Sequence, residues 1–270
     1  MHGAFRLSLP MLAVLTLLIG CANPEPQITT DPNAELPDDS PLAAQARKDP
    51  IALLEKCRSH AEANYFDYTC TFIKQERVNR TVLPKQTIDV AFRREPFSVG
   101  FKWLENPPRA DRLLYVAGRW DNQMLVRPSG ALARMVVPTA ARDPQGAEAM
   151  EQTLRPVTRF GFLRGLQSLL DVYRQARQAG DLETGYGGRV ELNGRPAVVL
   201  IRTLPDKNDY PAHVTRTYID EGYLVPVRIE ATNWDGQFQA MYEYTDIDFS
   251  AKLTDRDFRP EAWDLVPPKE

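Results

Sequence analysis

The sequence predicts an α+β fold in which helices cover one strongly curved, antiparallel half-barrel sheet of about eleven strands. Segments of alternating apolar and polar residues follow one another through most of the chain, and Asn-Gly, Glu-Gly and Asp-Gly turns join those of the second half. Two segments with helical spacing stand among them, one before the first strand and one after the sixth. Short links make neighbouring strands antiparallel, and one-sided alternation leaves an apolar face that the helices must cover.

The first 20 residues have the features of a secretory signal. Arg6 precedes an apolar run over 7–19, which is shorter than a membrane-spanning helix requires. The run leads through Leu-Ile-Gly into Cys21, a tetrad that resembles the bacterial lipobox. This resemblance implies removal of residues 1–20 and acylation of Cys21, and the alternative is an ordinary secretory signal with an incidental cysteine.

Residues 21–50 are rich in proline and aspartate and contain no aromatic residue. Such a segment buries too little apolar surface to fold, so we expect a disordered tether between the lipidated cysteine and the body. Residues 51–270 are then expected to form a single curved-sheet domain.

The body is expected to begin with a helix after Asp49-Pro50, because a capping residue followed by proline favours a helix start. Ile51, Leu54 and Cys57 recur in it at three-residue spacing. The strands that follow are expected over 67–78, 88–92, 97–103, 113–116, 123–127 and 132–137.

An interruption follows, with a loop over 140–150 that has room for a short helix. Phe162, Leu166, Leu169 and Tyr173 then form the apolar stripe of a helix that ends near Gly180. Strands are expected to resume over 189–192, 196–203, 214–220, 225–231 and 237–249.

Two segments, over 68–78 and over 94–103, resemble the domain-of-unknown-function family 1571, a family of planctomycete-type envelope lipoproteins. The order of elements over roughly 51–260 also resembles the LolA and LolB superfamily of lipoprotein carriers and receptors. This resemblance implies an unclosed, curved antiparallel sheet that wraps around an apolar cavity lidded by helices.

A cavity of this kind would be lined by large apolar side chains of the sheet and of the second helix. A position in an ordinary packed core is the alternative for each one of them. The candidates are Phe92, Phe101, Trp103, Met124, Phe162, Leu166 and Leu169.

The charge balance and the small number of metal-ligating residues exclude several classes of function. Lys and Arg number 33 against 36 for Asp and Glu, so no basic surplus exists for nucleic-acid binding. Three cysteines and three histidines are too few and too scattered for a metal centre. No catalytic constellation is recognisable, so we expect neither an enzyme nor a cofactor.

Charged residues alternate with apolar neighbours at Glu76-Arg77, at Arg93-Arg94-Glu95 and at Lys102, which predicts charge pairing on the solvent face. The alternative is an arginine at the cavity mouth that binds an anionic headgroup or a partner's carboxylate. Cys57 and Cys70 form an even pair once Cys21 is acylated. In an oxidising compartment they would be bridged, or they would remain two buried thiols if their elements pack without the required spacing.

The sequence therefore predicts a lipid-anchored, periplasm-facing lipoprotein of the cell envelope, which binds a lipid, a lipoprotein or another apolar ligand for transfer or sensing. Ala22 follows Cys21, and the absence of aspartate there favours the outer membrane. The alternative is a non-catalytic envelope protein that binds a protein or glycan partner through the outer face of its sheet.

Overall fold

A computed structural model describes residues 35–207 and 209–267 of the chain, and it contains one 13-stranded sheet. The main path of the sheet runs β1-β9-β10-β11-β12-β13-β2-β4-β5-β6-β7-β8, with β3 paired to β2 alone, and the recorded pairs are antiparallel. Because β1 and β8 lie at opposite ends of this path, the sheet is not closed. The strands are β1 (Glu35–Leu36), β2 (Asp67–Val78), β3 (Thr81–Val82), β4 (Gln86–Arg93), β5 (Ser98–Glu105), β6 (Ala110–Val116), β7 (Met124–Pro128), β8 (Ala140–Arg142), β9 (Glu183–Leu192), β10 (Arg195–Thr203), β11 (Val214–Asp220), β12 (Pro226–Thr232) and β13 (Phe238–Asp248).

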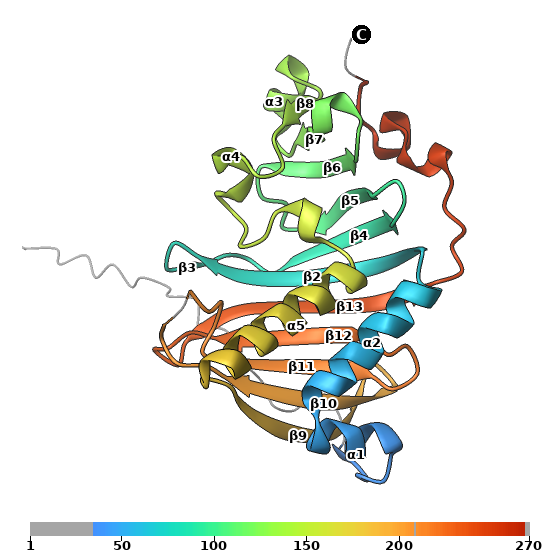
Figure 1. Ribbon diagram of the computed structural model, residues 1–270. Helices are drawn as coiled ribbons and strands as arrows, with labels where there is room; N and C mark the ends of the chain where they lie inside the picture. The colour runs from blue at the N-terminus through green and yellow to red at the C-terminus, as the bar shows by residue number, and fades with distance from the viewer. Residues whose placement is uncertain (1–34, 208, 268–270) are drawn as a thin grey trace, which may run out of the picture.

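Two long helices, α2 (Pro50–Asn64) and α5 (Phe162–Ala179), pack against each other across one face of the sheet, which we call the inner face (Figure 1). The shorter α1 (Pro41–Lys48) contacts α2 and the strands β9 and β10. Two further short helices, α3 (Ala131–Val136) and α4 (Ala147–Met150), lie in the connection between β7 and α5. The expected α+β class, with one curved and unclosed antiparallel sheet and covering helices, is confirmed.

Aromatic packing holds α5 to the inner face. The rings of Tyr68 and Phe162 lie 4.9 Å apart between centroids, and Tyr68 and Phe92 are equally close. Phe162 and Tyr173 of the expected apolar stripe are buried here together with Leu166 and Leu169. The helical spacing recognised in the sequence therefore marks the side of α5 that meets the sheet.

The C-terminal segment covers part of the opposite, outer face. Its short helices η3 (Asp255–Phe258) and η4 (Pro260–Trp263) contact β5 and β6, and Phe258 and Leu265 are buried against the sheet. Trp263 lies directly over Gly100, where an added Cβ would come within 2.0 Å of the indole ring. Glycine is thus required in β5 because an aromatic ring occupies the space of a side chain.

Ten of the eleven expected strands are present, and the segment 132–137 is the exception. It forms α3, because Leu, Ala, Arg and Met are strong helix formers and β7 has already ended at Pro128. Leu132, Met135 and Val136 are each more than 80% exposed on this helix. The three strands that the sequence reading missed, β1, β3 and β8, are only two or three residues long.

The expected tether over 21–50 needs a correction in its second half. β1 pairs with β9, and α1 buries Leu42 and Ala46 after an N-cap at Ser40, whose hydroxyl accepts a hydrogen bond from the amide of Ala43 at 3.0 Å. Pro41 and Pro50 each stand at a helix N-terminus, where proline is favoured, so these two prolines mark helix starts. The signal peptide, Cys21 and the rest of the expected tether lie outside the described residues.

Substitution of Gly100 by alanine is expected to lower the free energy of unfolding by about 1–3 kcal/mol, because Trp263 must be displaced. Urea denaturation of the purified chain measures this loss. Gly165→Ala is the control, since an added Cβ meets nothing within 4 Å there, and it should keep or raise the stability. An equal loss for Gly100→Ala in a Trp263→Ala background would contradict the explanation.

Candidate functional site

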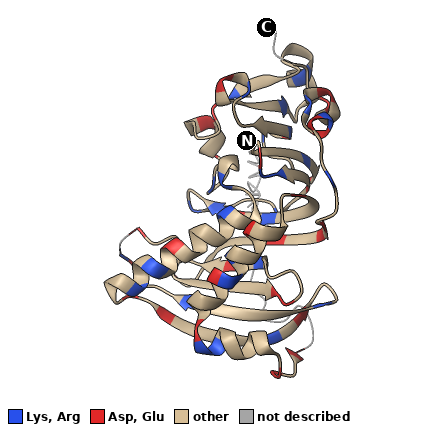
Figure 2. Cartoon of the chain, turned by 45° about the vertical axis from the view of Figure 1, so that its right-hand side comes forward, with Lys and Arg blue, Asp and Glu red and all other residues tan. Residues whose placement is uncertain are grey.

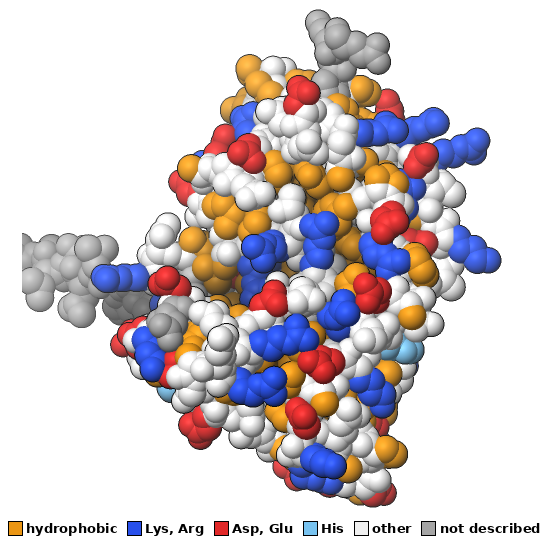
Figure 3. Space-filling view, in the orientation of Figure 1, with side chains coloured by type: hydrophobic (Ala, Val, Ile, Leu, Met, Phe, Trp, Pro, Cys, Tyr) orange, Lys and Arg blue, Asp and Glu red, His pale blue; other side chains and the backbone are white. Residues whose placement is uncertain are grey.

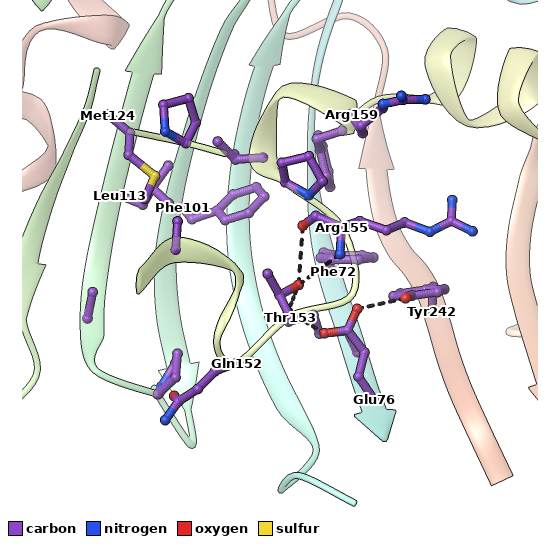
Figure 4. A pocket seen from close by; sticks show the side chains of 18 of the residues that line it. Phe72, Glu76, Phe101, Leu113, Met124, Gln152, Thr153, Arg155, Arg159 and Tyr242 are labelled. Carbon is purple, nitrogen blue, oxygen red and sulfur yellow. Dashed lines mark hydrogen bonds and ion pairs between the residues drawn. The ribbon is translucent and has the colours of Figure 1, made fainter. Parts of the chain in front are cut away.

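A cavity of about 220 Å³ lies between the inner face of β2, β5, β6 and β7 and the segment 143–161, which we call the covering segment (Figure 4). Apolar side chains gather over this half of the molecule, and basic side chains lie among and below them (Figure 3). The aromatic and larger aliphatic side chains of the cavity lining are Phe72, Phe101, Trp103, Leu113, Met124, Val126, Val157, Phe160, Phe162, Ile229, Tyr242 and Tyr244.

Phe160 anchors the covering segment to the aromatic wall of the cavity. Its ring centroid lies 5.0 Å from that of Phe101 and 5.3 Å from that of Phe72, both in edge-to-face arrangements. The next residue, Gly161, has φ +107°, and an added Cβ would lie 2.8 Å from the ring of Phe92. The chain can pass from the covering segment into α5 at this point only because residue 161 lacks a side chain.

A buried polar cluster stands beside the aromatic wall (Figure 4). Glu76 is 2% exposed, and one of its carboxylate oxygens accepts a hydrogen bond of 2.7 Å from the Tyr242 hydroxyl. Lys74 Nζ donates to its other oxygen at 3.0 Å and to Thr153 Oγ1 of the covering segment at 3.1 Å. Burial and the nearby Glu76 raise the pKa of Tyr242, so its hydroxyl stays protonated and acts as a donor.

Basic residues dominate the charged lining of the cavity. Two of them pair with acids of the covering segment, Arg109 with Glu151 at 2.6 Å and Arg142 with Glu148 at 2.7 Å. Both pairs are exposed, so each contributes only about 0–1 kcal/mol. Arg155 and Arg159 also line the cavity and pair with no acid of the described chain.

Over the whole molecule, basic and acidic side chains are interspersed on both halves (Figure 2). The cavity lining differs from this pattern, since it contains five basic but only two acidic side chains. An apolar interior with a basic surplus suits an apolar ligand that carries negative charge.

Four of the seven predicted cavity residues line the cavity: Phe101, Trp103, Met124 and Phe162. Phe92, Leu166 and Leu169 belong instead to the packed core between α5 and the sheet, where all three are less than 9% exposed. For these three residues, the alternative of an ordinary core position holds.

The sequence reading missed the polar residues of the site. The predicted position of Glu76 on the solvent face is wrong, because this residue lies on the inner face with Phe72 and Lys74. The alternation of β2 contains the information needed to place Glu76, since Phe72, Lys74 and Glu76 occupy every second position and so share one face of the strand. Arg155 had no such signal, because it lies in a connection without periodic structure.

Cys57 of α2 and Cys70 of β2 are both buried as free thiols. The bridge considered from the sequence is therefore absent from the structure, and the alternative of two buried thiols applies. Burial raises the pKa of the Cys57 thiol to about 12 and that of Cys70 further still.

Within the described part of the chain, no group of three or more His, Cys, Asp or Glu side chains has the arrangement of a metal site. Among the same residues, no helix has both the length and the apolar character needed to cross a membrane.

A family model described as "Protein of unknown function (DUF1571)" matches residues 65–264. The chain belongs to this family. The matched residues include β2 to β13 and the whole lining of the cavity, so the site is part of the family's domain. No curated protein matches the chain.

Several solved structures are similar to this family member. A chain of the complex of Pseudomonas aeruginosa MucA and MucB is 16% identical with a TM-score of 0.46, and the match covers 78% of this chain and 60% of that one. The lipoprotein LppX of Mycobacterium tuberculosis is 12% identical with a TM-score of 0.42, and the match covers 76% and 98% of the two chains. A LolA superfamily protein from Nitrosomonas europaea is 10% identical with a TM-score of 0.30, and the match covers 77% and 98%.

The burial of both thiols predicts slow modification of Cys57 and Cys70 in the folded protein, because only a minute fraction is thiolate at pH 8. We expect residues 22–270, purified without reductant, to release two equivalents of thionitrobenzoate from Ellman's reagent after unfolding and far less before it. Fewer than two thiols after unfolding would show that a disulfide forms in solution.

Proposed function

We propose that this protein is a lipid-anchored protein of the cell envelope that binds an acylated or otherwise apolar ligand in the cavity and delivers or senses it at the membrane. The observation that carries the proposal is the cavity lined by the aromatic wall of Phe72, Phe101 and Trp103, which side chains of the described residues leave partly unfilled. Such cavities bind ligands by apolar burial, with few polar groups to orient them, and need no catalysis.

The size of the cavity supports a mobile cover. Its volume of about 220 Å³ exceeds the roughly 150 Å³ of an engineered cavity that binds benzene, and it is below the roughly 300–1,000 Å³ of most ligand pockets. The space accommodates part of an acyl chain, so a longer ligand requires the covering segment to move outwards.

The polar contacts of the covering segment allow this movement. Two exposed ion pairs and the hydrogen bond from Lys74 to Thr153 together oppose opening by only a few kcal/mol. Ligand burial offsets that cost at about 25 cal/mol per Å² of apolar surface. The proposed binding cycle therefore couples entry of the ligand to displacement of residues 143–159, while the buried Phe160 stays on the aromatic wall.

The helix α3 provides an apolar surface near the cavity. Leu132, Met135 and Val136 project from it, and α3 contacts β7, whose Met124 and Val126 line the cavity. In the proposed function, this helix meets the bilayer, and acylated Cys21 keeps the protein at the periplasmic side of the outer membrane.

A second candidate function is the binding of a protein or glycan partner on the outer face. A polar groove of about 530 Å³ runs there between β2, β4 and η4, with Thr69, Asp89, Lys102 and Arg112 among its lining residues. Hydroxyl, carboxylate and basic groups in a groove are suited to hydrogen-bonding a polar partner.

Filling the cavity with a larger side chain should abolish ligand binding while the fold remains intact. Gly165 lines the cavity, and an added Cβ meets no atom within 4 Å, so Gly165→Leu directs an isobutyl group into empty space. We expect native mass spectrometry of residues 22–270 from a bacterial periplasm to detect bound lipid or acylated peptide, with at least tenfold less on the variant.

Gln178→Leu, on the exposed face of the same helix, is the matched control and should retain the ligand. A wild-type chain that carries no ligand and takes up no added fatty acid or lipopeptide would contradict the cavity proposal. The outer-face groove would then become the surface to study.

Acylation of Cys21 is tested by metabolic labelling with radioactive palmitate in a bacterial host. The wild-type chain should incorporate the label and sediment with membranes, whereas Cys21→Ser should do neither, because the acyl chains supply the membrane affinity. Cys57→Ser controls for the loss of a cysteine and should stay labelled. Equal labelling of the Cys21→Ser variant would refute the lipobox interpretation.

A further inference from the structure

Arg202 is a buried cation whose hydrogen-bonding groups are largely unused. It lies on β10, is 2% exposed, and donates from Nη2 to Thr215 Oγ1 at 3.0 Å. Its Nε and Nη1 have no hydrogen-bond partner among the described residues. The guanidinium carbon stands 5.2 Å from the ring centroid of Tyr173, whose buried hydroxyl is likewise without a partner. Arg202 Nε, Arg202 Nη1 and the Tyr173 hydroxyl are thus three buried donors close to α5 that have no acceptor among the described residues.

No acid balances this charge among the residues that the structure describes. Burial, opposed by Tyr173 and reinforced by the neighbouring Arg155, lowers the pKa of Arg202 to about 10, which leaves the side chain charged at neutral pH. A buried charge without a counter-ion is costly, and natural proteins normally pair it. Glu76, the buried acid of the cavity, already binds Lys74 and Tyr242.

A row of small side chains connects Arg202 with the cavity. On neighbouring inner-face strands, Glu76 is opposite Ala240, Ala240 is opposite Ala231, Ala231 is opposite Thr215, and Thr215 is opposite Arg202. Between the polar cluster at one end and the guanidinium at the other, no side chain of this row is larger than threonine. Small buried side chains therefore occupy the inner face between Glu76 and Arg202.

Arg155 reaches over the same side of the cavity. Its guanidinium carbon stands 5.5 Å from the ring centroid of Tyr242, and Figure 4 shows the side chain extending past Tyr242 and away from Phe72. Arg155 is exposed, comes from the covering segment and pairs with no acid of the described chain. Arg155 thus lies over Tyr242, two positions from Ala240 on β13, at the cavity end of the row.

We propose that Arg202, the Tyr173 hydroxyl and Arg155 form a subsite for an oxyanion, which is the carboxylate or phosphate of an amphiphile whose apolar chain occupies the cavity. This inference rests on the proposed function and specifies its ligand class. Arginine matches the planar geometry of carboxylate and phosphate, and its charge-assisted hydrogen bonds are stronger than neutral ones. Closure of the covering segment would bring Arg155 onto the headgroup.

Isothermal titration calorimetry of residues 22–270 tests the subsite with decanoate and decyl phosphate below their micelle concentrations and with 1-decanol below its solubility limit. The three ligands share one chain length, so they differ in the headgroup alone. We expect the wild type to bind at least one of the two anions about tenfold or more tightly than the alcohol, as one charge-assisted hydrogen bond allows. Comparing the two anions distinguishes a carboxylate ligand from a phosphate ligand.

The Arg202→Met variant should lose this preference and still bind 1-decanol as the wild type does. Arg177→Met removes the same charge from the exposed face of α5 and should keep the preference. If circular dichroism shows that Arg202→Met does not fold, Tyr173→Phe and Arg155→Gln replace it, and each should reduce the preference severalfold.

The outcomes separate the two proposals. Equal affinity of the wild type for all three ligands, or an unchanged preference in the folded variants, would overturn the oxyanion subsite and leave the apolar cavity standing. Failure of the wild type to bind any of the three would instead overturn the proposed binding function.

Discussion

The structure depends on one geometric constraint, which is that the inner face of the unclosed sheet is wider than two helices can cover. α2 and α5 cross the strands from β9 to β2, and their apolar sides form a continuous core with that half of the sheet (Figure 1). Among the described residues, the inner face of β5 to β7 is covered mainly by the covering segment, whose one α-helix, α4, is four residues long. The cavity exists because this second half is closed by a largely irregular segment instead of a long helix.

Charged groups are arranged differently on the two faces. Ion pairs such as Arg93 with Asp255 fasten the C-terminal segment to the outer face, where water screens them and where they contribute little individually. On the inner face, Glu76 is fully partnered, whereas Arg202 is not. The inner face therefore contains one polar cluster, around Glu76, whose hydrogen bonds are all made within the protein. It contains a second, around Arg202, whose free donors a ligand could satisfy.

The regular elements could be predicted from the sequence because their burial repeats with a fixed period. The alternation in β2 and the stripe of α5 identify their buried sides correctly. The site could not be predicted in full, since its polar groups come from positions that are distant in sequence. Tyr242 and Glu76 meet only through the pairing of β13 with β2, and Arg155 reaches them from an irregular segment. The prediction of a strand over 132–137 is wrong because the apolar residues of a short exposed helix show no clear helical period, so they resemble a strand.

The pairing of β1 with β9 limits how far the body can stand from a membrane. If Cys21 is acylated, the chain between it and Glu35 spans at most about 50 Å even when fully stretched, at roughly 3.3–3.6 Å per residue. The segment from Cys21 to Glu35 joins the body at β1, at one edge of the sheet, while α3 follows β7 near the opposite edge. For α3 to meet the same bilayer, the edge that carries β1 can then stand no farther from the surface than this length of chain. The anchor would thus limit the tilt of the molecule as well as its location.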